Sequence, residues 1–393
     1  QWEWIASVDS SDVDYLPNVA VDGMENSYVS VGVQSQVSPT FYNRGNVDAE
    51  LPPIVSALGP YMVFAKLSKE GSWLWRVYAD NQEQNLDDND QHINYMGIDS
   101  RGDVFISASR NTSDSDTIIL YDLEDVATVV TRMTAYGRWF PTIKLKSDGL
   151  WSWNAMAIVS NSTDQSDAAS TLVATVTDLN DTYTFMHMLK SEVDFELYDR
   201  DGNSQISQGN GVIAERTMRR FNRLNASGYW AWSAYIEGPG SLVLAGQSGN
   251  HVCLFDDVEN HLKEFYIISQ YDDNSVAEEF FDRDGTNSLS ANTSTELNHL
   301  VVGKINSTGV WQHYARVEGV DANANANIAC DSFGDVYVSC ILLSGNVATF
   351  YDKDEQNTIT TSAAAEDSLM VCKLSRDGFW QWFNFASTII DTD

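Results

Sequence analysis

Pairs of aspartates two residues apart recur in the sequence, and they are the first candidates for metal chemistry. Oxygen ligands at alternate positions suit a hard cation such as calcium. However, the two glycines that follow stand at the fourth position of the loop, no glutamate stands at the twelfth, and an Asp/Gly turn between strands explains the same residues. The pattern favours turns and leaves calcium as the alternative. The pairs are Asp199 and Asp201, Asp282 and Asp284, and Asp352 and Asp354.

Five basic residues occupy one position of a repeated phrase, although the chain has only 23 Lys and Arg in total. We expect each cation to pair with a carboxylate or carbonyl of its own or the adjacent unit, while its aliphatic stem covers apolar surface. A ring of these cations that binds an anion is the alternative. The five residues are Lys66, Lys144, Arg223, Lys304 and Lys373.

No catalytic pattern stands out in the sequence. The six histidines have no metal-ligand spacing, and neither a Gly-x-Ser-x-Gly elbow nor a phosphate-binding glycine loop occurs. Acids such as Asp22, Asp99, Asp178 and Asp331 recur at one place in the units, which is typical of turns, whereas a catalytic pair would break the repeat. We therefore assign no catalytic or cofactor-binding residue, and expect no cofactor apart from the calcium alternative.

The cations belong to a phrase that occurs five times, first as KLSKEGSWLW over 66–75. Its glycines lie at positions 71, 149, 228, 309 and 378. Alternating apolar residues, a short polar turn that ends at glycine, and alternation again predict a β-hairpin. The tryptophans of Trp-x-Trp are expected on one face of the strand, as core between units and not as an exposed ligand platform. They are Trp73, Trp75, Trp151, Trp153, Trp230, Trp232, Trp311, Trp380 and Trp382.

Two further phrases accompany this hairpin. A second hairpin is predicted upstream, clearly in the first, second and fifth units, and in degenerate form near 172–187 and 241–255, with Gln247-Ser248-Gly249 at the last turn. A Phe/Leu-Tyr/Phe-Asp/Asn phrase, the aromatic phrase, lies between the two hairpins of every unit. Long inserts are expected around 154–170 and 255–279.

The order of these phrases resembles the β-propeller repeats of large bacterial and viral surface proteins. Two hairpins per unit give four strands, so the prediction is an all-β propeller of about five four-stranded antiparallel blades. The resemblance implies a scaffold or binding surface without shared catalytic residues. The propeller is expected over 17–393, with repeats 17–80, 81–157, 158–237, 238–318 and 319–393. Residues 1–16, with Trp2 and Trp4, are expected to add a strand to a blade edge or to be the remnant of an upstream repeat.

The composition excludes some partners. The formal net charge is −33 and the pI is about 4.2, so a nucleic acid would be repelled. An anionic membrane surface is disfavoured for the same reason, and no apolar run of about 18 residues could span a bilayer. We expect a protein or a glycan as partner.

The cysteines and glycosylation sequons allow alternatives. Cys330 and Cys340 flank one predicted hairpin, so a disulfide between them and buried free thiols both remain open; Cys253 and Cys372 lie in other apolar runs. Sequons in a chain this rich in Asn, Ser and Thr also arise by chance. The candidate glycosylation sites are Asn111, Asn161, Asn180, Asn225, Asn292 and Asn306.

These features predict a non-enzymatic structural and binding protein of the extracellular space, a cell surface or a virus particle. It would be processed from a longer precursor and could assemble into a larger particle or layer. A calcium-dependent adhesin is a variant of this prediction. A secreted glycan-processing enzyme, with carboxylates that converge from different units, is the alternative.

Overall fold

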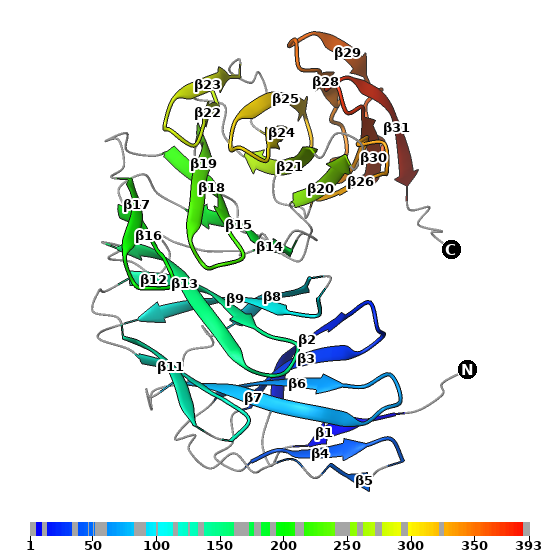
Figure 1. Cartoon of the computed structure of the whole chain (residues 1–393). Coiled ribbons are helices and arrows are strands. Elements are labelled where there is room, and N and C mark those ends of the chain that lie inside the picture. The colour runs from blue at the N-terminus through cyan, green and yellow to red at the C-terminus, as the bar shows by residue number, and fades with distance from the viewer. Residues whose placement is uncertain are drawn as a thin grey trace.

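The structure is a computed structural model of the whole chain. It describes residues 5–9, 14–33, 38–45, 47–49, 51, 61–81, 92–99, 101–112, 117–124, 126–132, 137–160, 173–176, 182–188, 194–208, 216–239, 252–257, 262–271, 277–291, 298–321 and 326–387. Every regular element among these residues is a strand, and the strands form several antiparallel sheets. The all-β prediction is confirmed (Figure 1).

The first two sheets show the plan of the fold. A three-stranded sheet, here the N-terminal sheet, contains β1 (Ser7–Asp9), β4 (Thr40–Asn43) and β5 (Val47–Asp48). Sheet I has the order β2 (Asp14–Val21), β3 (Ser27–Val33), β6 (Tyr61–Leu67), β7 (Trp73–Asn81), β10 (Thr117–Tyr121) and β11 (Ala127–Arg132).

Sheets II and III repeat this six-stranded plan. Sheet II contains β8 (His92–Ile98), β9 (Val104–Thr112), β12 (Gly137–Leu145), β13 (Trp151–Ser160), β16 (Asp194–Tyr198) and β17 (Ser204–Gln208). Sheet III contains β14 (Val173–Val176), β15 (Thr182–Met188), β18 (Arg216–Leu224), β19 (Trp230–Pro239), β22 (Glu279–Phe281) and β23 (Asn287–Ser290).

The last two sheets differ in size. Sheet IV has six strands, β20 (Val252–Asp257), β21 (Leu262–Tyr271), β24 (His299–Asn306), β25 (Trp311–Glu318), β28 (Thr349–Tyr351) and β29 (Asn357–Thr360). Sheet V has four, β26 (Asn327–Cys330), β27 (Val336–Leu342), β30 (Ser368–Leu374) and β31 (Trp380–Ser387).

Sheets I to IV thus have six strands where the sequence predicts four. The extra pair is the hairpin that begins with the aromatic phrase, and it comes from the following repeat; β10, for example, pairs with β7. The Trp-x-Trp strand β7 pairs along nearly its whole length with β6, and its last residues, from Tyr78 to Asn81, also pair with β10 of the added hairpin. The added strands cover an edge that would otherwise remain unpaired.

The fourth repeat corrects two predictions. Its first hairpin is formed by β20 and β21, so its turn lies after Asp257 and not at Gln247-Ser248-Gly249, which falls outside the described residues. The predicted insert 255–279 therefore contains β21, and the predicted insert from 154 begins within β13. A degenerate apolar alternation fits more than one register, which explains the misplacement.

The sheets follow one another along an arc (Figure 1). Their first strands β2, β8, β14, β20 and β26 are neighbours in succession on the inner side, while β11, β17, β23 and β29 lie on the outer side. Among the described strands, none pairs sheet V with sheet I. Apolar clusters fill the space between successive sheets; Tyr28 and Phe64 of sheet I, for example, pack with Met96 and Ile143 of sheet II. The core is therefore divided into one layer per pair of sheets.

Candidate functional site

The repeated cations lie in rows of three side chains that hairpin register places side by side. Lys66 is opposite Tyr28 on β3 and opposite Trp75 on β7. Lys144 is likewise opposite Phe105 and Trp153. Because directly opposed residues point to the same face of a sheet, each cation stands between two aromatic side chains. The Lys66 ammonium is 4.8 Å from the centre of the Tyr28 ring, and Lys144 is 4.9 Å from that of Phe105.

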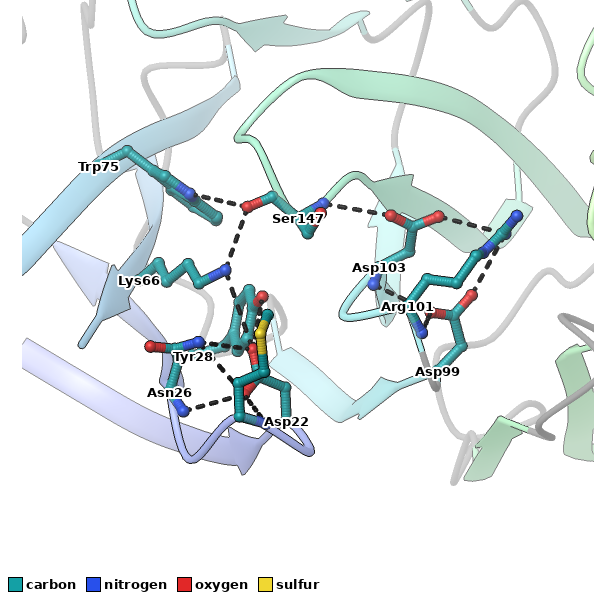
Figure 2. A network of polar contacts seen from close by, with 10 residues as sticks. Asp22, Asn26, Tyr28, Lys66, Trp75, Asp99, Arg101, Asp103 and Ser147 are labelled. Carbon is teal, nitrogen blue, oxygen red and sulfur yellow. Dashed lines mark hydrogen bonds and ion pairs between the residues drawn. The ribbon is translucent and has the colours of Figure 1, made fainter. Parts of the chain in front are cut away.

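The row of sheet I reaches the second hairpin turn of sheet II, and we call this contact the junction (Figure 2). The Lys66 ammonium and the Trp75 indole N–H both donate to the carbonyl oxygen of Ser147, at 3.3 and 3.1 Å. The Ser147 amide donates in turn to Asp103 Oδ1 at 3.2 Å. Since Ser147 is two residues before the motif glycine Gly149, the turn itself joins the two sheets.

Carboxylates of the first hairpin neutralise these cations. Lys66 lies 3.8 Å from Asp22 Oδ2, and Lys144 lies 3.0 Å from Asp103 Oδ2. Burial opposes the charge on Asp22, yet hydrogen bonds from the Asn26 side chain and amide, the Met24 amide and the Tyr28 hydroxyl hold its pKa below the ordinary value. The carboxylate therefore stays ionised beside the lysine.

The later junctions use the same groups. Trp153 donates to the Ala226 carbonyl, and Arg223 and Trp232 both donate to the Ser307 carbonyl. Lys304 donates to the Arg376 carbonyl and pairs with Glu264 at 2.9 Å. In sheet V, Lys373 pairs with Asp335 at 2.8 Å. The predicted pairing of the cations with carboxylates or carbonyls is confirmed, and the described contacts provide no ring of cations facing a common anion.

The motif glycine is required for two reasons at each junction. Gly149 has φ +86°, a conformation that side-chain-bearing residues rarely adopt, and a Cβ there would approach the Trp75 ring to 3.1 Å. Gly228 and Gly309 have the same relation to Trp153 and Trp232. At Gly378 the neighbour is His313, which stands where the other repeats have the second tryptophan. In the first four repeats the second aromatic ring thus packs on the glycine turn of the next repeat.

The first tryptophan of each pair contacts the preceding sheet. Its indole N–H donates to the backbone carbonyl of the middle aromatic-phrase residue of its own repeat, as Trp151 does to Tyr121 on β10 at 2.9 Å. The equivalent bonds join Trp73 to Tyr42, Trp230 to Tyr198, Trp311 to Phe281 and Trp380 to Tyr351.

The two tryptophans therefore do not share one apolar layer, which corrects the expectation that they point to one face. Trp73 and Trp75 belong to different core clusters, as do Trp151 and Trp153. The register shifts at each of these hairpins directly before the turn, for instance between Lys66 and Leu67. Such a β-bulge re-aims side chains along the strand. The prediction that the tryptophans form core between units holds for eight of the nine, which are buried, whereas Trp382 is exposed.

The aspartates proposed as calcium ligands are engaged in turns. Asp199 Oδ1 accepts the amides of Asp201 and Asn203, and Asp352 Oδ1 accepts those of Asp354 and Gln356. Asp282 Oδ1 accepts the Trp311 amide, and Asp284 Oδ1 accepts the Thr286 amide. Within the part of the chain that the structure describes, no three His, Cys, Asp or Glu side chains are grouped so that they could hold a metal ion.

The cysteines are free and meet in other pairs than the one considered from the sequence. Cys330 Sγ donates to the Leu254 carbonyl at 2.9 Å and lies beside the Cys253 thiol, whereas Cys340 lies beside Cys372. Contact with the Cys330 thiol and burial raise the pKa of Cys253, and burial raises that of Cys372. Sequence spacing could not reveal this pairing because Cys253 and Cys330 belong to different sheets.

The glycosylation candidates are only partly described. Asn225 and Asn306 lie in the second hairpin turns of the third and fourth repeats, where their side-chain oxygens accept backbone amides. Asn111 lies in β9. The remaining candidates, Asn161, Asn180 and Asn292, lie outside the described residues.

One charged cluster breaks the repeat, and the sequence analysis missed it. His299 of sheet IV is hydrogen-bonded to Glu278, which precedes β22 of sheet III, and both are fully buried. Arg219 lies 4.8 Å from the Tyr271 ring, and burial lowers its pKa. Glu278 Oε2 and His299 Nδ1 have no hydrogen-bond partner among the described residues. Because these side chains are enclosed between two sheets, a polysaccharide could not reach them in this conformation.

No protein-family model matches the chain, and a search of curated proteins finds no significant similarity to it. The described residues include no helix of the length and apolar character needed to cross a membrane.

Proposed function

We propose that this chain is a non-enzymatic structural and binding protein of an extracellular, cell or virus-particle surface, built on repeats of the β-propeller type. In this proposal sheets I to V are five blades, each with four strands from its own repeat, and the outer hairpins join neighbouring blades. The successive order of the first strands on the inner side of the arc supports this architecture.

The observation that carries the functional proposal is that the repeated cations are all engaged in contacts within the scaffold. The cation of every repeat is engaged with a carboxylate or with a carbonyl of the next turn. Lys66, Arg223 and Lys304 reach the turn of the next sheet. The residues that repeat therefore hold the scaffold together, which leaves the loops to bind a partner. The negative charge favours a protein or glycan partner over a nucleic acid.

The proposal is tested by locating the protein in its source. Quantitative mass spectrometry of purified particles, envelopes and culture medium should find it as a component of fixed copy number in a particle or envelope fraction. Surface labelling of intact material should modify its lysines. Recovery from the medium as a monomer that cleaves polysaccharides, with activity abolished by replacement of one non-repeating carboxylate, would replace it with the glycan-processing alternative.

The turn aspartates are proposed to stabilise turns and not to bind calcium. We expect calcium chloride or a chelator to leave the melting temperature unchanged, because Oδ1 of Asp199 and Oδ1 of Asp352 already accept amides within the turn. A calcium-dependent rise that is lost in Asp199→Asn would instead support the adhesin variant. Differential scanning fluorimetry of both proteins makes the comparison.

A further inference from the structure

Successive sheets contact each other through their first strands, at the inner side of the arc (Figure 1). In sheets I and II, Ala20 of β2 and Ile98 of β8 pack in one apolar cluster at this contact. Between sheets IV and V the corresponding cluster contains Cys253 of β20 and, at its border, Cys330 of β26. Two facing positions that are apolar in the first contact are thus both cysteine in the last.

Hairpin register shows that these positions correspond. Ala20 is opposite Tyr28, whose ring lies beside the repeated lysine of sheet I. Cys253 is opposite Tyr266, whose ring lies beside the repeated lysine of sheet IV. Cys330 directly precedes the turn aspartate of its hairpin, as the last residue of β8 does. The two cysteines therefore replace side chains that face each other across the contact.

The side chains of the two cysteines point toward each other. Alternation along β20 directs Cys253 and Phe255 to the layer shared with sheet V, whereas Leu254 packs against the cluster on the other side. Cys330 Sγ lies 2.9 Å from the Leu254 carbonyl oxygen and accepts a hydrogen bond from the Cys253 thiol. The Cα atoms of β20 and β26 approach within 8 Å, and a disulfide needs a Cα separation of about 4.4 to 6.8 Å.

The second pair of neighbouring thiols has a different geometry. Cys340 of β27 is opposite Met370 on β30. Cys372 of β30 is opposite Val338 on β27, so the two cysteines are diagonal neighbours in one sheet. Diagonal residues of an antiparallel pair have Cα atoms about 7 to 8 Å apart, too far to be bridged without movement of the backbone. Both thiols are also fully buried, whereas Cys330 is half-buried at the edge of sheet V.

We propose that Cys253 and Cys330 are a modification site, where oxidation forms a disulfide that joins the first strands of sheets IV and V. The Cys330 thiolate attacks the disulfide bond of the oxidant, which is oxidised glutathione or an oxidoreductase disulfide, and one thiol leaves as a mixed disulfide forms. Cys253, after loss of its proton, then attacks the Cys330 sulfur and releases the second thiol. The two cysteines lose two electrons and two protons, and the oxidant gains both.

The surroundings of the two thiols set the order of these steps. The hydrogen bond from Cys253 lowers the pKa of Cys330, whereas contact with Cys330 and burial raise that of Cys253. Cys330 is also the more exposed of the two, so the oxidant reaches it first. The bond closes a long loop, from 253 to 330, and so stabilises the chain by constraining its unfolded state. This inference goes beyond the proposed surface function and does not depend on it.

Thiol counting on the full chain tests the site. Folded protein is treated with oxidised glutathione, denatured in the presence of N-ethylmaleimide, and its intact mass is measured. Wild type should take up two alkyl groups where the fully reduced protein takes up four, and peptide mapping should recover Cys253 linked to Cys330. Four alkyl groups, a persistent glutathione adduct, a linkage of Cys340 to Cys372, or a linkage found only in dimers would overturn the proposal.

Melting temperatures separate the disulfide from side-chain packing. Cys253→Ala and Cys330→Val introduce the residues of the first repeat, Ala20 and Val21, so both proteins should fold. Reduction by dithiothreitol should lower the melting temperature of oxidised wild type by about 5 °C and leave both variants unchanged. Cys372→Ala is the matched control and should keep the linkage and the response. Absence of the response in wild type, or an equal response in the two variants, would contradict the proposal.

Discussion

At the scale of single residues, the repeated cations of this protein pair with carboxylates or turn carbonyls. Lys144 is buried between Phe105 and Trp153 and pairs with Asp103 of its own sheet. A buried cation is tolerated because a carboxylate and two aromatic faces replace its water shell. The sequence predicted this role from position alone, although it could not name the partners, since they depend on the register of two hairpins.

Replacement of the buried lysines should lower stability. Lys144→Ala and Lys304→Ala are each expected to reduce the free energy of unfolding by about 2 kcal/mol, because the buried ion pair with Asp103 or Glu264 is lost. The two carboxylates then keep only the more exposed Arg101 and Arg376 as cationic partners. Chemical denaturation monitored by tryptophan fluorescence measures the loss. Lys373→Ala is the control and should cost less, because its ion pairs are more exposed. Equal losses in all three proteins would contradict this account.

His313 should make stability depend on pH. Burial, together with the charges of Lys304 and Lys353, lowers its pKa to about 3 from an ordinary value of 6.5. Between pH 3 and pH 6.5 the unfolded chain therefore binds a proton at His313 that the folded chain does not bind. The contribution of neutral His313 to the free energy of unfolding is thus present above pH 6.5 and is lost as the pH falls toward 3. His313→Phe should flatten melting temperature against pH in this window.

Trp232→Phe is the control for this experiment, because Trp232 occupies the equivalent position in the preceding sheet and does not titrate. Its pH profile should keep the shape of the wild-type curve. If His313→Phe also keeps the wild-type shape, another group is responsible for the pH dependence.

At the scale of elements, the hairpin is the unit that the sequence encodes most directly. Alternation, the polar turn and glycine are local signals, so strands such as β6, β7, β12 and β13 lie where they were predicted. The first hairpin of the fourth repeat was misplaced because its turn has no such glycine. The β-bulge beside the turn was also missed, and it separates the two tryptophans into different layers.

The motif glycines should be more sensitive than other turn glycines. Gly149→Ala is expected to cost about 2 to 4 kcal/mol, because it combines backbone strain with a clash against Trp75. Gly202 has a similar φ of +77° but no neighbour within 4 Å of an added Cβ, so Gly202→Ala should cost about 1 kcal/mol from strain alone. Urea denaturation of both proteins separates the cost of backbone strain from the cost of the clash with Trp75. Equal costs would show that ring packing at the turn contributes little.

At the scale of the whole molecule, sheets stacked in succession make stability a sum over neighbouring contacts. The net charge of −33 produces a long-range repulsion that disfavours this stacking. The cations of the repeats reduce this repulsion locally by pairing with carboxylates.

Added salt should therefore stabilise the folded chain. Screening acts over about 10 Å at 0.1 M salt, which weakens repulsion between surface carboxylates more than it weakens the buried junction pairs. We expect the melting temperature to rise by a few degrees between low and physiological ionic strength. Sodium chloride and choline chloride should act alike if screening is the cause. A falling melting temperature would mean that exposed ion pairs dominate.

The sequence by itself determined the all-β class, the fivefold recurrence of a glycine-turn hairpin and the structural position of its cation. These features depend on residues close together in the chain, where alternation and turn chemistry decide the conformation. The tertiary structure alone decided that the aromatic phrase completes the preceding sheet, that β1 binds β4, and that Cys330 meets Cys253. Such contacts join residues of different repeats, so they follow from bulge geometry and the stacking of sheets, which no local pattern records.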